Sequence, residues 1–112
     1  MIVYNRLNMV AIMKKGSFKS ISTPEFRALI TEDNIQLLDV RTPEEFELRK
    51  IEGATLIDYY SANFEQQIDL LLDASIPVAI YCRSGVRSVD AGLILKEKGF
   101  TVYNLKEGII SW

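Results

Sequence analysis

One stretch decides the fold: residues 78–87, which read VAIYCRSGVR. Its first four residues, Val78 to Tyr81, are apolar on both faces, and such a strand belongs in the middle of a covered parallel sheet. A short loop with a turn-forming glycine at Gly85 follows, and a helix then runs to Lys98. We therefore expect Cys82 at the carboxyl end of a central strand, where α/β proteins build their sites.

The rest of the chain alternates the same two kinds of element. Two capping boxes and one periodic apolar stretch predict further helices, and short apolar runs between them predict strands. The expected strands lie at residues 18–21, 35–40, 54–57 and 101–103, and the expected helices begin at Ser22, at Thr42 and near Phe64. This alternation predicts an α/β fold: a single three-layer domain with a mainly parallel five-stranded sheet flanked by helices.

The chain has 112 residues, which is the size of one domain. Residues 1–16 are interpreted as an N-terminal extension and residues 17–112 as the domain. The apolar piece from Met9 to Met13 is too short for a secretory signal, and its lysines, Lys14 and Lys15, follow it instead of preceding it. No apolar run approaches the roughly 20 residues of a membrane span, so no membrane partner is expected.

Composition excludes several kinds of function. Thirteen basic and 15 acidic residues give a net charge of -2, so no nucleic-acid partner is expected through bulk charge. The absence of histidine excludes Cys-His and Ser-His-Asp catalysis and any His-ligated zinc. Because Cys82 is the single cysteine, we expect no disulfide, no metal site and no cofactor. A lone thiol suits a reducing compartment, here the cytoplasm.

The loop after the central strand has the chemistry of an anion site. Backbone N–H groups at a helix start lack intrahelical acceptors and can converge into a nest, and the helix dipole adds about half a positive charge. Arg83 and Arg87 add two cations with no acid between them. Such surroundings favour the thiolate, which is the nucleophile. The predicted site has Cys82 as the catalytic residue and a substrate-binding loop of Arg83, Ser84, Gly85, Val86 and Arg87.

Two other interpretations of this loop stay open. Cys82 can be a buried small hydrophobe, as most free cysteines are, or the loop can bind an anion with the thiol incidental. At the end of another strand, Asp39 and Arg41 suggest structural support for the site. There we expect an ion pair of Arg41 with either Asp39 or Glu45.

The octapeptide YCRSGVRS, residues 81–88, resembles the active-site loop of the rhodanese family of sulfurtransferases. Further stretches between residues 18 and 112 match the family pattern in order, and the ordered set is specific although each stretch is short. They are Asp39-Val40-Arg41 with Glu45-Phe46, Ile51-Glu52-Gly53-Ala54, Gly99-Phe100 with Val102 to Leu105, and Gly108-Ile109 with Trp112. Lys50, Leu56 and Glu107 depart from the family pattern.

The resemblance implies a sulfur carrier. Cys82 would take a sulfane sulfur from a small anionic donor such as thiosulfate and become a persulfide. It would then pass the sulfur to cyanide or a thiol, a thioredoxin-like protein being one candidate acceptor. Arg83 and Arg87 would hold the donor. The loop Cys-x4-Arg is one residue shorter than that of related phosphatases, which disfavours a phosphatase or arsenate reductase. A non-catalytic module that binds an anion or a protein is the alternative.

Overall fold

A computed structural model gives the architecture of the protein and describes residues 2–4, 11–13 and 15–112. The elements, in chain order, are β1 (Ile2–Tyr4), β2 (Ala11–Met13), β3 (Ser17–Ile21), α1 (Thr23–Leu29), β4 (Gln36–Asp39), α2 (Pro43–Leu48), β5 (Thr55–Leu56), α3 (Phe64–Leu71), β6 (Val78–Tyr81), α4 (Val86–Glu97), β7 (Thr101–Leu105) and the 3-10 helix η1 (Ile109–Ser111). Strands and helices alternate from β3 onward, which confirms the predicted α/β class.

Five strands form one parallel sheet in the order β3-β7-β6-β4-β5. Strand β6 lies at its centre, and all four of its residues are buried, as its apolar sequence predicts. Its neighbour β4 pairs with it in register as far as Asp39 opposite Tyr81. The carboxyl ends of β4 and β6 therefore meet at one edge of the sheet.

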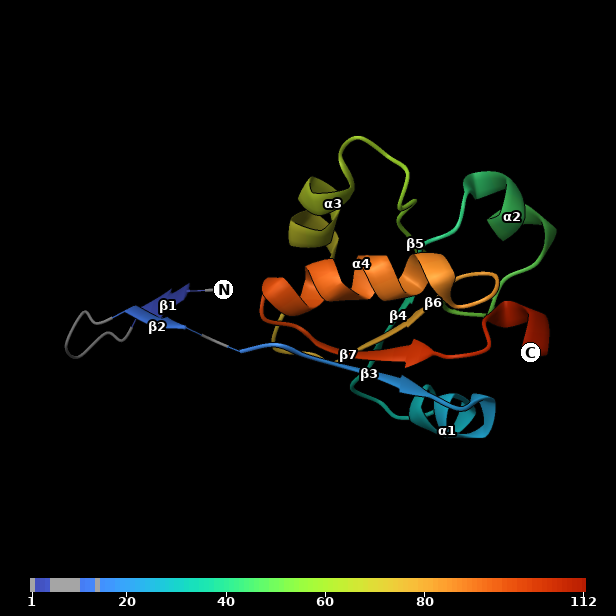
Figure 1. Ribbon diagram of the computed structural model, residues 1–112, viewed down its shortest axis with the longest axis horizontal. Helices are drawn as coiled ribbons and strands as arrows, with labels where there is room; N and C mark the ends of the chain where they lie inside the picture. Colours follow the sequence, from blue (N-terminus) through green and yellow to red (C-terminus); the bar gives the residue numbers. More distant parts are fainter. Residues whose placement is uncertain (1, 5–10, 14) are drawn as a thin grey trace.

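Helices cover both faces of this sheet, which confirms the three-layer architecture (Figure 1). Helices α3 and α4 pack on one face and α1 with η1 on the other. Because side chains alternate along a strand, Ile80 and Cys82 face α4, whereas Tyr81 packs in the opposite core with Phe26. The cysteine is thus directed into the layer between β6 and α4.

The helices differ in how their N-termini are capped: α1 and α2 have side-chain caps, whereas α4 has none. Both capping boxes form, Ser22 with Glu25 at α1 and Thr42 with Glu45 at α2. Helix α4 begins differently, because its N-cap Gly85 has the left-handed φ of +94° and no side-chain cap bond. The first turn of α4 therefore keeps its backbone N–H groups free of a side-chain cap.

The structure differs from the sequence predictions at the two ends of the chain. Strand β7 extends to Leu105, and the final turn is a 3-10 helix. Within residues 1–16, β1 and β2 pair antiparallel as a separate two-stranded sheet, which the sequence did not predict. Residues 1, 5–10 and 14 of that predicted extension lie outside the described residues. Within the described ranges, no helix has the length and apolar character needed to cross a membrane.

Candidate active site

The candidate site lies where the carboxyl ends of β4 and β6 meet. The backbone N–H of Val40, just after β4, donates to the carbonyl of Tyr81 at 3.2 Å, so the two strand ends are held together. The loop that leads into α4, helix α2 and the C-terminal turn gather at this same end of the domain (Figure 1). This is the edge at which parallel sheets place their sites.

Cys82 is buried, with 1% of its surface exposed, and packs in the core beneath α4. Its sulfur nevertheless accepts two hydrogen bonds: from the Gly85 backbone N–H at 3.1 Å and from the Ser88 hydroxyl at 3.3 Å. The sequence predicted a converging set of amides, whereas one backbone N–H donates to Sγ among the described residues. The sulfur is therefore directed at polar donors at the start of α4 and not only at hydrocarbon.

The C-terminal turn holds the backbone of this loop. The N–H of Ile109 donates to the carbonyl of Cys82 at 2.9 Å, and the N–H of Ile110 donates to that of Arg83 at 3.2 Å. Gly108 approaches so closely that a Cβ there would lie 2.1 Å from the Arg83 carbonyl oxygen. At Gly85 a Cβ would lie 2.3 Å from the Lys106 carbonyl oxygen. Both glycines have positive φ, so side-chain-free backbone defines the shape of the loop.

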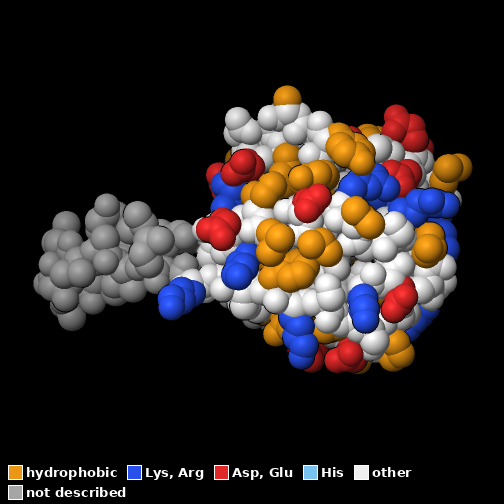
Figure 2. All heavy atoms as spheres, in the orientation of Figure 1, with side chains coloured by type: hydrophobic (Ala, Val, Ile, Leu, Met, Phe, Trp, Pro, Cys, Tyr) orange, Lys and Arg blue, Asp and Glu red, His pale blue; other side chains and the backbone are white. Residues whose placement is uncertain are grey.

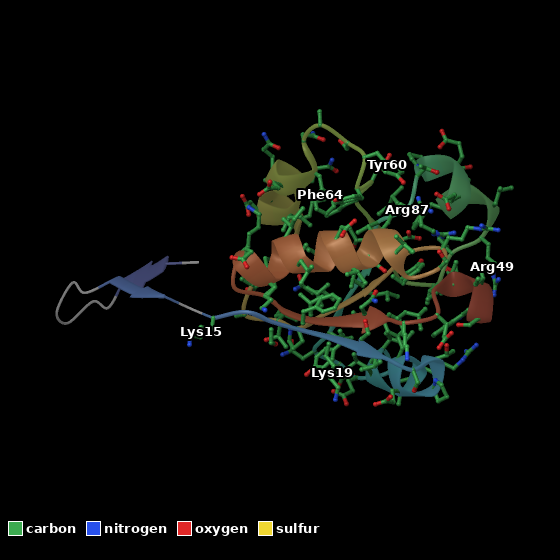
Figure 3. All side chains as sticks on the ribbon, viewed as in Figure 1. Lys15, Lys19, Arg49, Tyr60, Phe64 and Arg87 are labelled. Atoms are coloured by element: carbon green, nitrogen blue, oxygen red, sulfur yellow. The ribbon has the colours of Figure 1, made fainter. Side chains whose placement is uncertain are left out.

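Arg87 is not a free cation in this structure. Its guanidinium makes two hydrogen bonds to the carboxylate of Glu45, at 2.7 and 2.9 Å, across 42 positions of sequence. Hydrogen bonds from Arg87 lower the pKa of Glu45 to about 2. Figure 3 places Arg87 beside Tyr60, whose ring centroid lies 5.6 Å from the guanidinium carbon. The pair therefore joins α2 to the first turn of α4 beside the sulfur.

The Asp39–Arg41 pair is buried below the site. The Arg41 guanidinium donates to both carboxylate oxygens of Asp39, at 2.7 Å in the shortest contact, and to the carbonyl of Arg49 at 2.6 Å. Of the two partners predicted for Arg41, the structure shows Asp39. The other, Glu45, forms its ion pair with Arg87 instead. The Tyr81 ring lies 5.5 Å from the Arg41 guanidinium carbon, and burial raises the pKa of Tyr81. These contacts brace the end of β4 next to β6.

The remaining predicted loop residues face solvent. Arg83 and Ser84 are exposed, and Val86 is 70% exposed. Within residues 15–112, Arg83 takes part in none of the ion pairs closer than 4.0 Å. Lysine and arginine side chains gather at this end of the molecule, beside acidic side chains of α2 (Figure 2). Arg83 is therefore the cation of the loop that is available to an incoming anion.

Sequence reasoning did not identify two features of the site. Ser88 is the last residue of the octapeptide 81–88, but the sequence assigns no role to its hydroxyl, which donates to the sulfur in the structure. The partner of Arg87 was not predicted, because no local spacing connects it to Glu45. Among the described residues, no group of three or more His, Cys, Asp or Glu side chains is arranged to hold a metal ion.

Comparison with known proteins identifies the family. The family model named Rhodanese-like domain matches residues 22–112, which is most of the chain. The protein therefore belongs to the rhodanese-like domain family, and the resemblance predicted from residues 81–88 is confirmed at this level.

Individual relatives carry several names. The uncharacterized protein YqhL of Bacillus subtilis is 38% identical over 90% of this chain and 77% of its own length. The probable adenylyltransferase/sulfurtransferase MoeZ of Mycobacterium tuberculosis is 35% identical over 70% of this chain, which spans 20% of that protein. The tRNA uridine(34) hydroxylase of Chlamydia pneumoniae is 32% identical over 84% of this chain and 31% of its own length.

A solved structure supports the fold independently. The rhodanese-like domain protein of Staphylococcus aureus superposes with a TM-score of 0.73 and 29% identity, over 84% of this chain and 90% of that one. The family thus includes proteins named as sulfurtransferases and others named for different reactions. Because one fold hosts many reactions, membership of the family does not by itself specify the reaction of this chain.

Proposed function

We propose that this protein is a sulfurtransferase in which Cys82 carries a sulfane sulfur as a persulfide. The observation that carries the proposal is the position of its sulfur, which accepts the Gly85 N–H at 3.1 Å at the start of α4. A backbone donor and the dipole of α4 stabilise negative charge there, and two cations, Arg83 and Arg87, follow the thiol in the same loop. The thiolate is the nucleophilic form of cysteine, and it needs no histidine in this arrangement.

The first half of the reaction loads the carrier. The thiolate of Cys82 attacks the outer sulfur of thiosulfate, the Sγ–S bond forms, and the bond within thiosulfate breaks with its electron pair leaving on sulfite. Thiosulfate carries two negative charges, so a cation at the mouth of the site favours its approach. Arg83 supplies that cation because it is exposed, whereas Arg87 is held by Glu45. In this proposal Arg87 positions the loop through its bond to Glu45, and its paired guanidinium still attracts the anionic donor weakly.

The second half unloads the carrier. A thiophilic acceptor, cyanide or a thiol, attacks the outer sulfur of the persulfide, and the electron pair of the breaking bond returns to Sγ. The remaining N–H groups of the loop would hold that outer sulfur before transfer. Acceptors on proteins, including a thioredoxin-like one, fit the same chemistry. A cytoplasmic location, proposed from the lone thiol, would supply such thiols in reduced form.

One observation favours a second candidate. The Cys82 side chain is 1% exposed, and a thiol so covered suits a module that binds an anion or a partner without chemistry. The two candidates differ in whether the sulfur reacts. A third possibility, a phosphatase or arsenate reductase, is disfavoured because the loop from Cys82 to Arg87 has four intervening residues, one fewer than in related phosphatases.

The test is turnover. Wild-type protein with thiosulfate and cyanide should produce thiocyanate, and Cys82→Ser, with similar size and no thiol, should produce none. An aryl phosphate and arsenate are assayed in parallel as alternative substrates. Absence of thiocyanate together with binding of the anion by both proteins would favour the non-catalytic module. Cys82-dependent turnover of either alternative substrate, without thiocyanate, would favour the phosphatase or reductase.

A further inference from the structure

The hydroxyl of Ser88 has one hydrogen-bond partner among the described residues, the sulfur of Cys82. Ser88 is the third residue of α4, is 0% exposed, and lies 3.3 Å from Sγ. Its hydroxyl thus donates directly to the atom that forms and breaks bonds in the proposed reaction. A buried hydroxyl normally finds a partner, and here the partner is a sulfur instead of a carbonyl of the preceding helical turn.

We propose that Ser88 is a further catalytic residue that stabilises Sγ as the leaving group when sulfur is transferred to the acceptor; this rests on the proposed sulfurtransferase function. In the loaded state the negative charge lies on the outer sulfur. When the acceptor attacks, the bond between the two sulfurs breaks and its electron pair moves onto Sγ. A donor already hydrogen-bonded to Sγ therefore gains strength as this charge develops.

The same contact acts differently in the two half-reactions. Before loading, the hydrogen bond stabilises the reactant thiolate, which increases its population but decreases its nucleophilicity, and these effects oppose each other. During unloading it stabilises only the product thiolate, so its full effect is expressed in the rate. Gly85 N–H donates to the same sulfur at 3.1 Å, but its contribution cannot be removed without changing the backbone. Ser88 is the side-chain donor that can be removed cleanly.

The test is single-turnover discharge of the persulfide in Ser88→Ala. Wild type and variant are loaded with thiosulfate, freed of donor, and mixed with cyanide or with a small thiol. Because a hydrogen bond to a charged group contributes about 1.5–3 kcal/mol, discharge should slow by about tenfold or more, and to the same extent for both acceptors. Ile94→Val, at the far end of α4, is the control for a general weakening of this helix. It should discharge at the wild-type rate.

A second readout does not require sulfur transfer. The pH dependence of Cys82 alkylation by iodoacetamide should move to higher pH in Ser88→Ala and stay unchanged in Ile94→Val. An unchanged profile, discharge at the wild-type rate, or slowing with only one acceptor would each overturn the role of Ser88. If wild type accepts no sulfur, the shifted profile in Ser88→Ala would still show the contact with the thiolate. That result would overturn the proposed function and, with it, the role in discharge.

Discussion

Two neighbouring strands, β4 and β6, end at the same edge of the sheet, and the loops that follow them are held in different ways. The segment after β4 is held by side chains. Arg41 forms an ion pair with Asp39, and Thr42 caps α2 together with Glu45. The loop after β6 is held mainly by backbone contacts. Its carbonyls accept hydrogen bonds from N–H groups of η1, and Gly85 and Gly108 allow the loop and the C-terminal segment to lie close together. The loop after β6 thus leaves the Arg83 side chain exposed, while the Cys82 sulfur is held by the Gly85 N–H and the Ser88 hydroxyl.

One interaction connects the two loops. Glu45, at the N-terminal end of α2, binds Arg87 in the first turn of α4 at 2.7 Å. This ion pair is partly exposed: 26% of the Glu45 side chain and 19% of the Arg87 side chain are accessible to solvent. The side chains of Asp39 and Arg41 are almost fully buried. Burial strengthens charge interactions and removes the solvent that would otherwise compensate a lost partner. The buried pair after β4, the backbone contacts after β6 and the partly exposed pair between the loops should therefore contribute different amounts to the free energy of unfolding.

The largest effect is expected from breaking the buried pair after β4. Arg41→Met leaves the carboxylate of Asp39 buried without its cation, and the free energy of unfolding should fall by about 3–5 kcal/mol. Urea denaturation measures this loss. Glu45→Gln is the comparison variant, because it breaks the partly exposed pair. Equal losses of unfolding free energy in Arg41→Met and Glu45→Gln would show that burial does not make the first ion pair more important for stability than the second.

The next effect concerns the backbone contacts after β6. Gly108→Ala places a Cβ against the Arg83 carbonyl at positive φ, and should cost about 3 kcal/mol from combined backbone strain and overpacking. It should also greatly reduce sulfur loading, because the loop must move. Gly53→Ala is the matched control, since Gly53 has a φ of +89° but no neighbour within 4 Å of the added Cβ. It should cost about 1–2 kcal/mol and leave loading intact. Equal behaviour of both variants would refute the role of close approach.

A smaller effect is expected from the connection between the loops. A double-mutant cycle of Glu45→Gln and Arg87→Met should give a coupling free energy of about 1 kcal/mol, because both groups are partly exposed. A coupling near zero would mean that the pair does not join the loops.

The same pair predicts a pH dependence. The pKa of Glu45 is lowered from 4.5 to about 2 in the folded protein, so below pH 4.5 the unfolded state binds more protons. The stability that Glu45 contributes should be complete above pH 4.5 and be lost as the pH falls toward about 2. The difference in unfolding free energy between wild type and Glu45→Gln should therefore decrease over this interval. A difference that is constant with pH would contradict the assignment.

The smallest effect on stability is expected at Arg83, the exposed cation of the loop. Arg83→Met should change the free energy of unfolding by less than about 0.5 kcal/mol. It should raise the KM for thiosulfate by about two- to fivefold, the size expected for one exposed charge. Lys19→Met, an exposed cation on β3 well away from the loop (Figure 3), is the charge-matched control and should not change KM. Equal changes in KM would mean that net charge, not position, attracts the donor.

Sequence reasoning succeeded where the signal is local. The apolar run of β6, the two capping boxes and the glycine at position 85 are each defined by a few adjacent residues, and the structure shows all of them. From these follow the class of fold and the place of Cys82 at the end of the central strand. The family resemblance added the order of short matches that single elements could not provide.

It fell short where contacts join distant parts of the chain. The bond between Arg87 and Glu45 spans 42 positions, and the bonds from Ile109 and Ile110 to the loop depend on how the C-terminal turn packs. Ser88 has the small side chain that close packing of α4 requires, so its hydroxyl contact with Sγ becomes visible only in three dimensions. The strands β1 and β2 lack a distinct alternating pattern and were not predicted.

The most direct test of the central claim is the intact mass of the protein after incubation with thiosulfate and removal of the donor. If Gly85, Ser88 and the start of α4 make Cys82 a sulfur carrier, wild type gains the mass of one sulfur atom and Cys82→Ser gains none. Addition of cyanide should then return wild type to its original mass. An unchanged wild-type mass, or an equal gain on Cys82→Ser, would contradict the account.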